Sequence, residues 1–544
     1  MGTLDEGSAA LSAAFRRMRG WLACACALLA MALGVTPAAA HVGSPDTWFE
    51  GNAGPYPIRV VVRAPGVVPG LAEIDVRVLS GAPEHVTVQA FVWNAGAAGA
   101  PPPDAALPVP GDARLYSVNL WLMVASSYGV HVTVTGEQGR GTAIVPVQAV
   151  ATRRLPMDAK LTAILAALAL FLFAGLLTVV GAAVRDSSAP AEEQPDRASA
   201  MRARVAMAIT AVVLALALFG GRSWWNRIDR AYAADMYQPF HMTASIADSA
   251  GASMLRLTID DPRWLGREWT PLISDHGKLM HLFLVRDTDM KALAHLHPIL
   301  RDSSHFETRM PPLPAGTYQL YADIVHESGF AQTMTASVEV AGPAGDSRAG
   351  APGASPATYS PADVDDSWFE GQAVSAGDAA EVRFPLADGS TLIWERGPRP
   401  IVARSESPLR FRVILPDGTP ARLEPFLGMV AHAMVRRSDG AVFAHLHPTG
   451  SVSMAAQMAL MMRTPADSLA GSLGRRLASE DMTSHSMMPD MPGHPSSVLP
   501  SEFSIPYGFP LSGRYRIWVQ VKRAGVVQTA AFDVDVVPPS AKRS

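Results

Sequence analysis

The stretch that decides the fold runs from residue 281 to residue 298 and reads HLFLVRDTDMKALAHLHP. Two apolar runs flank a polar turn at residues 286–291, which is the pattern of a β-hairpin. His295 and His297 are two residues apart, so on a strand they project from the same face. His281 lies near the far end of the partner strand, where cross-strand pairing can bring it beside them. The stretch therefore predicts three converging imidazoles on a rigid hairpin.

The same pattern recurs later in the chain. His432 precedes an Ala-His-Leu-His-Pro run at residues 444–448, with almost the spacing found in the first copy. A shorter sequence similarity relates DTWFEG at residues 46–51 to DSWFEG at residues 366–371. Self-similarity of this kind indicates repeated structural units. The sequence thus predicts two copies of one β module and a third unit that is related to them.

Histidines in this arrangement suit Cu(II) or Zn(II), because imidazole is a good ligand for both ions. A single His-x-His on a strand is often only a polar face, but here both copies have a third histidine at a matching distance. The competing interpretation is structural, with imidazoles hydrogen-bonded to backbone beside Pro298 and Pro448. Four histidines without a counterpart are expected at the surface, although one of them, His276, lies close to the hairpin: His241, His276, His305 and His326. The predicted metal ligands are His281, His295 and His297 in one copy, and His432, His445 and His447 in the other.

Methionine favours copper over zinc. Eight of the 24 methionines fall between Met454 and Met491, and thioethers are soft ligands that select Cu(I). The first four have helical spacing, so a short amphipathic helix that packs methionine on the sheet is the competing interpretation for them. Residues 484–495 are polar and Pro-rich and are expected to form a mobile ligand arm. Its predicted ligands are Met487, Met488, Met491 and His494.

The N-terminal 40 residues have the features of a signal peptide. An Arg-rich start at residues 16–19 precedes an apolar core, and three alanines end at Ala40. Cys24 and Cys26 are the two cysteines of the chain, and both lie in this segment, so cleavage after Ala40 leaves no thiol. A lipoprotein anchored through one of these cysteines is the alternative.

Cleavage after Ala40 would make His41 the mature N-terminus. Its α-amino group and Nδ1 could then chelate one copper ion together, since a metal competes for the proton of the amine. His85 and His131 lie in the same predicted domain and could complete the set. His41 is therefore a further predicted ligand.

Two apolar runs, at residues 161–184 and 205–221, are candidates for membrane spans. The first is long enough to cross a hydrocarbon core of ~30 Å, and tandem tryptophans at residues 224–225 suit a membrane edge. We expect a transmembrane hairpin over residues 158–222 with a short cytoplasmic loop at 185–204. Two spans return the chain to the same side, so all β domains are expected on the periplasmic side of the inner (plasma) membrane.

The chain is therefore expected to be mainly β, with three β domains and the transmembrane hairpin. The 44 glycines and 44 prolines predict frequent turns and few long helices outside the membrane. The expected order is a signal peptide (1–40), an N-terminal domain (41–150), the hairpin (158–222), a first module (232–340), a linker (341–361) and a second module (362–538) with a Met/His-rich insertion (454–495).

With the signal cleavage before His41, the His-Leu-His-Pro hairpins and the Met/His arm, the chain resembles the periplasmic copper carriers of the CopC and YtkA-like type. The resemblance implies immunoglobulin-like β-sandwiches, copper binding and no catalysis. The copper(II) site of that family joins the N-terminal histidine to a later Asp-x-His. Residues 41–150 contain no Asp-x-His, so His41 is the one ligand of that site that the resemblance implies in this chain.

These patterns predict a membrane-anchored metal-binding protein that buffers or delivers copper, with zinc as the second candidate metal. Expected partners are the membrane and an envelope copper protein or transporter. Nucleic acid is excluded, because a net charge of −4 provides no basic face. An enzyme is not expected, since there is no mature cysteine for an electron-transfer copper site, no Ser/His/Asp pattern and no cofactor loop. The alternative function is an envelope scaffold of immunoglobulin-like domains without a metal role.

Overall fold

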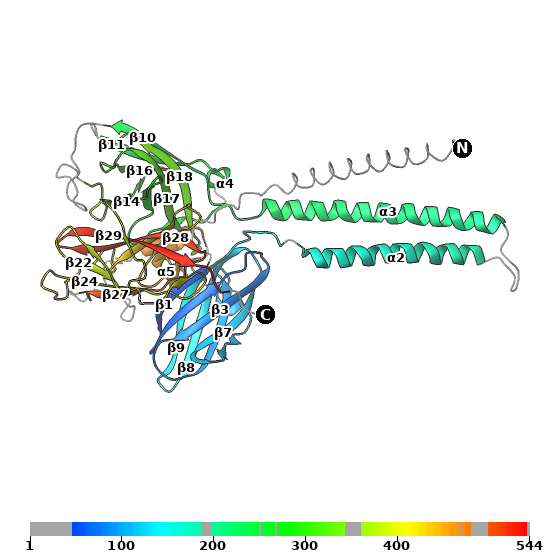
Figure 1. The fold of residues 1–544 in the computed structure, drawn as a ribbon, viewed down its shortest axis with the longest axis horizontal. Helices are drawn as coiled ribbons and strands as arrows, with labels where there is room; N and C mark the ends of the chain where they lie inside the picture. The colour runs from blue at the N-terminus through cyan, green and yellow to red at the C-terminus, as the bar shows by residue number, and fades with distance from the viewer. Residues whose placement is uncertain are drawn as a thin grey trace, which may run out of the picture. The chain divides into compact units, whose positions relative to one another are not determined.

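The computed structural model describes residues 46–155, 157–186, 197–249, 252–266, 269–342, 361–467, 469–479 and 499–540. Within these ranges the chain is mainly β, with several antiparallel sheets and two long apolar helices (Figure 1). Several predicted features lie outside the described residues: the signal peptide, His41, most of the linker, and the arm with Met487, Met488, Met491 and His494.

The N-terminal strands form two antiparallel sheets around one core. The strand orders are β1-β2-β3-β7-β6 and β5-β4-β8-β9. Residues alternate between core and surface along β3, where Ala72, Ile74 and Val76 are buried, as expected for a strand with one face in a core. The elements are β1 (Asp46–Ala53), β2 (Tyr56–Arg63), β3 (Gly70–Val78), β4 (Pro83–Val92), η1 (Ala97–Gly99), β5 (Asp104–Ala105), β6 (Leu107–Val109), β7 (Asp112–Leu122), β8 (Ser126–Gly136) and β9 (Gly139–Ala149).

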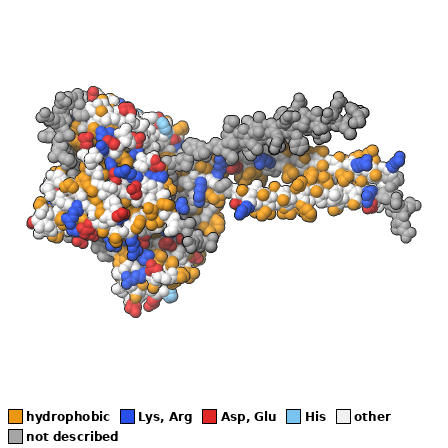
Figure 2. All heavy atoms as spheres, viewed as in Figure 1, with side chains coloured by type: hydrophobic (Ala, Val, Ile, Leu, Met, Phe, Trp, Pro, Cys, Tyr) orange, Lys and Arg blue, Asp and Glu red, His pale blue; other side chains and the backbone are white. Residues whose placement is uncertain are grey.

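Two helices, α2 (Ala159–Asp186) and α3 (Arg197–Ala234), are long and apolar enough to cross a membrane. Their most apolar windows have mean hydropathies of 2.7 and 2.1 and are almost entirely unburied, and Figure 2 shows them covered with hydrophobic side chains. They pack closely, since a Cβ at Gly181 would lie 2.7 Å from the sulfur of Met207. Both helices extend into the predicted loop at 185–204, and α3 continues past the predicted end at residue 222, because helical hydrogen bonding does not stop where hydrophobicity does.

The first module also has two antiparallel sheets and a core between them. One has the order β10-β11-β16-β15, and the other β12-β17-β13-β14-β19, with β18 on β17. Its elements are β10 (Met242–Ser249), β11 (Ala252–Ile259), α4 (Pro262–Leu265), β12 (Leu272–Ile273), β13 (His281–Arg286), β14 (Ala292–Leu296), β15 (Ile299–Leu300), β16 (His305–Arg309), β17 (Gly316–His326) and β18 (Ala331–Val340).

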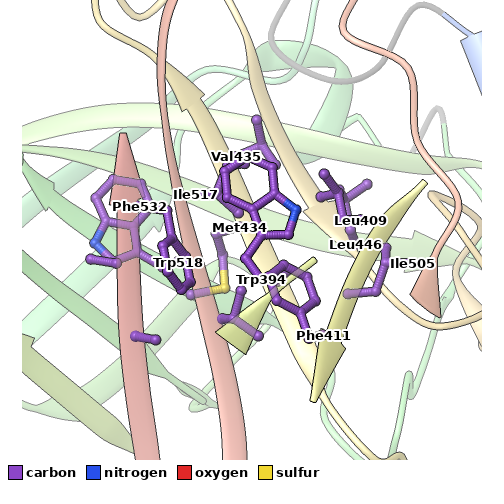
Figure 3. Packing of buried hydrophobic residues seen from close by; sticks show 14 of the residues in the cluster. Trp394, Leu409, Phe411, Met434, Val435, Leu446, Ile505, Ile517, Trp518 and Phe532 are labelled. Carbon is purple, nitrogen blue, oxygen red and sulfur yellow. The ribbon is translucent and has the colours of Figure 1, made fainter. Parts of the chain in front are cut away.

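The second module repeats this plan around an aromatic core that includes Trp394, Phe411, Trp518 and Phe532 (Figure 3). Its sheets have the orders β20-β29-β28-β25-β26, with β23 on β29, and β21-β22-β24-β27. In contrast to the first module, β20 and β23 pair with β29 in parallel. Its elements are β19 (Ser367–Glu370), β20 (Val374–Ser375), β21 (Val382–Pro385), β22 (Thr391–Trp394), β23 (Ile401–Val402), β24 (Leu409–Ile414), β25 (His432–Arg437), β26 (Phe443–Leu446), α5 (Met454–Met462), α6 (Ser472–Ser479), β27 (Glu502–Ile505), β28 (Gly513–Arg523) and β29 (Val526–Val537).

The two Trp-Phe-Glu-Gly segments join neighbouring units in the same way. In β19, Ser367 pairs with His295 of β14, so this strand of the second module completes a sheet of the first. In β1, Phe49 pairs with Gly450, three residues after His447. In each segment the tryptophan packs on the core of the unit that receives it, and the phenylalanine enters the core of its own unit. Each segment therefore docks beside one His-Leu-His-Pro run.

Candidate metal centre

The predicted hairpin forms, and its register brings the first three histidines together. Leu282 of β13 pairs with Leu296 of β14, which sets His281 at the end of the strand beside His297. Nδ1 of His281 lies 3.2 Å from Nε2 of His295, and the rings of His281 and His297 are 5.0 Å apart. All three are buried. The prediction of three converging imidazoles is confirmed for this copy.

The second copy has the same geometry. Ala433 pairs with Leu446, the equivalent of the pair in the first copy. The ring of His447 lies 5.0 Å from that of His432 and 4.5 Å from that of His445. The three side chains are likewise buried, with His445 6% exposed.

The two histidine sets face each other and form one cluster. The rings of His281 and His445 are 5.3 Å apart, and those of His295 and His445 are 5.8 Å apart. His295 also lies 6.3 Å from His432. The sequence left open whether the two modules have separate sites. Their histidines share one buried site between them, which we call the histidine cluster.

His276 is a seventh member of the cluster, so its predicted surface position is wrong. Its ring lies 5.4 Å from that of His447 and 5.5 Å from that of His432, and its side chain is 3% exposed. His326 is also buried, among Trp264 and Trp269. Neither position is a histidine in the second copy, where Leu427 takes the place of His276. Burial through tertiary contacts leaves no signal in one sequence. His241 and His305 are exposed, as predicted.

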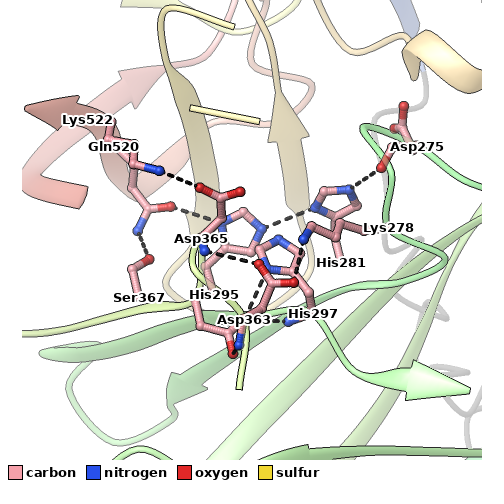
Figure 4. Close-up of polar contacts among 11 residues, drawn as sticks. Asp275, Lys278, His281, His295, His297, Asp363, Asp365, Ser367, Gln520 and Lys522 are labelled. Atoms are coloured by element: carbon pink, nitrogen blue, oxygen red, sulfur yellow. Dashed lines mark hydrogen bonds and ion pairs between the residues drawn. The ribbon is translucent and has the colours of Figure 1, made fainter. Parts of the chain in front are cut away.

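Each module supplies the partner of the central histidine of the other module. Gln520 Oε1 lies 3.0 Å from Nδ1 of His295, and a carboxylate oxygen of Asp323 lies 3.4 Å from Nδ1 of His445. Gln520 and Asp323 are equivalent, because they pair across the sheet with His432 and His281. Figure 4 shows Gln520 reaching His295 from the other module. Such partners fix the ring orientation and tautomer of a metal-bound histidine.

Asp366, which begins the second Trp-Phe-Glu-Gly segment, holds His297. Its Oδ1 accepts a hydrogen bond from the backbone N–H of His297 at 2.8 Å and lies 3.0 Å from the ring Nδ1. The other ring nitrogen of His297, Nε2, therefore faces the cluster. The segment that leads into β19 therefore joins the modules and also fixes the orientation of a histidine of the site.

Burial favours the neutral form of five of the imidazoles. Burial lowers the pKa of His281, His295, His432 and His445 well below its usual value, and the neighbouring imidazoles lower it further. Burial also lowers the pKa of His447, to about 4. Neutral imidazole is the form that binds a metal ion.

Two buried carboxyl groups beside the cluster have pKa values that are shifted in opposite directions. Burial raises the pKa of Asp323 to about 7. Burial would also raise the pKa of Asp275, but the imidazoles of His276, His281 and His447 hold it below its usual value. Asp275 also caps α5, since its Oδ1 accepts from the backbone N–H of Ala455 at 3.0 Å.

Several buried ring nitrogens of the cluster have no hydrogen-bond partner among the described residues. A buried polar atom without a partner is costly, so such a group in a folded protein calls for an explanation. Neutral imidazoles whose unpartnered nitrogens converge are the donor set of a copper or zinc site. The residues therefore fit a metal ion. The atoms are Nε2 of His276, His297, His432, His445 and His447, and Nδ1 of His432.

The two predictions about methionine-rich segments have different outcomes. Met454–Met462 forms the helix α5, as the competing interpretation proposed. Its buried side chains are alanines, Gln457 and Leu460, however, while Met461 is 47% exposed. Met454, Met458 and Met462 are half-buried, so the alanines, Gln457 and Leu460 form the buried face of this helix and the methionines lie at its margin. The ligand arm at 484–495 lies outside the described residues, so its role stays a prediction.

Comparison with known proteins gives little beyond one module. A family model described as a domain of unknown function (DUF8832) matches residues 238–342, which is less than half of the chain. No curated protein matches. A solved tetra-tandem repeat from the extending region of a large adhesion protein is 8% identical, over 90% of this chain and 82% of that one, with a TM-score of 0.15.

A second solved structure is a protein from Corynebacterium diphtheriae whose name describes it as membrane anchored. It is 9% identical over 92% of this chain and 97% of that one, with a TM-score of 0.14. Likeness at these TM-scores carries no argument about the fold or function of this chain. The resemblance to copper carriers stays a prediction.

Proposed function

We propose that this protein is a membrane-anchored, extracytoplasmic metal-binding protein that buffers or delivers copper through the histidine cluster. The observation that carries the proposal is the set of six unpartnered ring nitrogens that seven neighbouring histidines bury between the two modules. A purely structural cluster would be expected to satisfy these atoms with hydrogen bonds. Copper is favoured over zinc because eight methionines follow the second module's hairpin in the sequence.

The proposed setting follows from the rest of the chain. The helices α2 and α3 would form the transmembrane hairpin in the inner membrane, with three immunoglobulin-like sandwiches on the periplasmic side. An envelope copper protein or transporter would be the partner that supplies or removes the metal. His41 and the arm with Met487, Met488, Met491 and His494 would be the exposed ligands that exchange it. No enzymatic activity is proposed.

Copper and zinc titration of the full chain in detergent tests this proposal. We expect copper binding in competition with a chelator of known affinity. Each of His295→Ala/His297→Ala and His445→Ala/His447→Ala should lose its share of the bound copper, with the affected ion held at least about 100-fold more weakly, because each variant removes two ligands. His241→Ala/His305→Ala is the matched control, since both side chains are exposed. Glutamine replacements at the same positions keep more of the side-chain volume and separate lost ligands from lost packing.

A chain that binds neither metal more tightly than millimolar would overturn the proposal. The envelope scaffold would then be the better function, because the docked Trp-Phe-Glu-Gly segments alone would account for the contact between units. An unchanged amount of bound copper in both double variants would place the metal elsewhere in the chain and would equally reject the cluster.

A further inference from the structure

We infer that the histidine cluster holds two metal ions side by side, the first bound by His281, His295 and His297 and the second by His276, His432 and His447. This inference rests on the proposed metal-binding function and adds the number of ions and the ligands of each. In each of these two sets the ligand atoms lie within 4.8 Å of one another. The sets share no residue, so neither ion takes a ligand from the other.

The second set crosses the boundary between the modules. His432 and His447 belong to the second module, whereas His276 comes from the loop before β13 of the first. The first set lies wholly on the hairpin of the first module. One ion is thus held by a single hairpin, and the other would tie the two modules together.

The backbone at His276 is shaped to bring its ring into the cluster. Its φ is +52°, in the left-handed region that few residues other than glycine adopt, and Gly277 follows with φ +78°. The turn is closed by two backbone hydrogen bonds between Asp275 and Lys278, of 2.8 and 2.9 Å. The second module has the same turn at Leu427 and Gly428, with φ +52° and +75°, so the conformation belongs to the repeated module and His276 is the ring that this turn places at the cluster. Nε2 of His276 is buried without a partner among the described residues.

The sets are close enough for their ions to interact. Ring centroids are 6.2 Å apart between His276 and His281, and 6.3 Å apart between His295 and His432. His445 lies between the sets, 5.3 Å from His281 and 5.5 Å from His432, with its Nε2 unpartnered. It is therefore placed to add a ligand to either ion.

The surroundings provide negative charge for two cations. The cluster itself is made of uncharged ligands, and two buried carboxylates lie against it: Asp275 beside His276 and Asp366 beside His297. Buried charge is tolerated where opposite charge compensates it. Each of the two histidine sets thus has one buried carboxylate beside it, which would compensate the charge of one ion.

The test is the copper content and magnetic behaviour of the full chain. After anaerobic loading with Cu(I) and removal of weakly held metal with a chelator, we expect two ions per chain in the wild type and one in His276→Asn. Asparagine tolerates the left-handed backbone, so this variant removes the ring without forcing the loop to refold. His305→Ala, at an exposed histidine, should keep two. Thermal melts would confirm that both variants are folded.

Oxidation to Cu(II) then reports whether the ions are neighbours. Two adjacent cupric ions should couple, so the wild-type electron paramagnetic resonance signal should account for well under the total copper, whereas the single ion of His276→Asn should be counted in full. One ion in the wild type, an unchanged count in His276→Asn, or two uncoupled ions would overturn the paired site and leave copper binding intact. Absence of any bound copper would instead reject the proposed function itself.

Discussion

Replacement of Gly450 by alanine is expected to lower the free energy of unfolding by about 3–5 kcal/mol, because it should expel the buried Trp48 from the second module. Gly450 has a φ of +111°, and a Cβ placed on it would overlap the carbonyl oxygen of Trp48. The overlapping atoms belong to the backbone, which cannot swing aside as a flexible side chain can. The β1 segment would therefore have to leave its position.

The contacts that would be lost are made by the residues on both sides of Gly450. The backbone N–H of Glu50 donates to Thr449 O at 2.9 Å, and that of Ser451 donates to Trp48 O at 3.0 Å. Trp48 itself is 2% exposed and belongs to the core of the second module. The backbone N–H of Trp48 also donates to Ser451 Oγ at 3.0 Å. Loss of the strand would thus remove three hydrogen bonds and a buried indole together.

Gly428→Ala is the matched control for this prediction. Gly428 lies in the same module and also has a positive φ, of +75°, but no atom lies within 4 Å of a Cβ built on it. Denaturant unfolding followed by tryptophan fluorescence should place Gly450→Ala well below Gly428→Ala, and limited proteolysis should cut near residues 46–51 only in the former. Equal destabilisation of both variants would contradict the prediction, because the lost free energy of unfolding would then come from backbone strain at a positive φ and not from displacement of β1.

Much of the site could be predicted from the sequence because strand geometry is local. The two-residue spacing of His295 and His297 fixes a common face, and hairpin pairing fixes the place of His281. The repeat then extends the same reasoning to His432, His445 and His447. The two long apolar helices follow from composition in the same direct way.

What the sequence could not provide is the contact between the modules. Nothing in either hairpin says that the two histidine sets face each other, since that depends on which sheet edges meet. His276 was missed for the same reason, because its loop position has no periodicity and the second copy has Leu427 in its place. The exchange of Gln520 and Asp323 between modules could have been suspected from their equivalent places in β28 and β17, opposite the first histidine of each hairpin.

The metal-free protein is expected to lose stability steeply as the pH falls below about 6.5. Five histidines of the cluster have a pKa in the folded protein below the value of about 6.5 that they have in the unfolded chain: His281, His295, His432, His445 and His447. Between the two values the unfolded chain binds protons that the folded protein does not, so their stabilising contribution is present above pH 6.5 and is lost on acidification.

The size of the effect can be set from His447, whose folded pKa is about 4. At pH 5 this residue alone costs about 2 kcal/mol relative to neutral pH, at 1.36 kcal/mol per pKa unit. Asp323 acts in the opposite direction, because its pKa is raised to about 7; its contribution is present below pH 4 and is lost as the pH rises through 7. One carboxyl group against five imidazoles leaves a net loss of stability on acidification.

Denaturant midpoints measured between pH 7.5 and pH 5 in the presence of a chelator would check this prediction. We expect a steep fall in the wild type and in His305→Ala, whose side chain is exposed, and a shallower fall in His432→Phe, which removes one buried titrating group. Bound copper should delay the fall to lower pH, because protons must then compete with the metal for the same ring nitrogens. A midpoint that stays constant down to pH 5 would contradict the prediction, since it would mean that the cluster opens to water or accepts protons without cost to the fold.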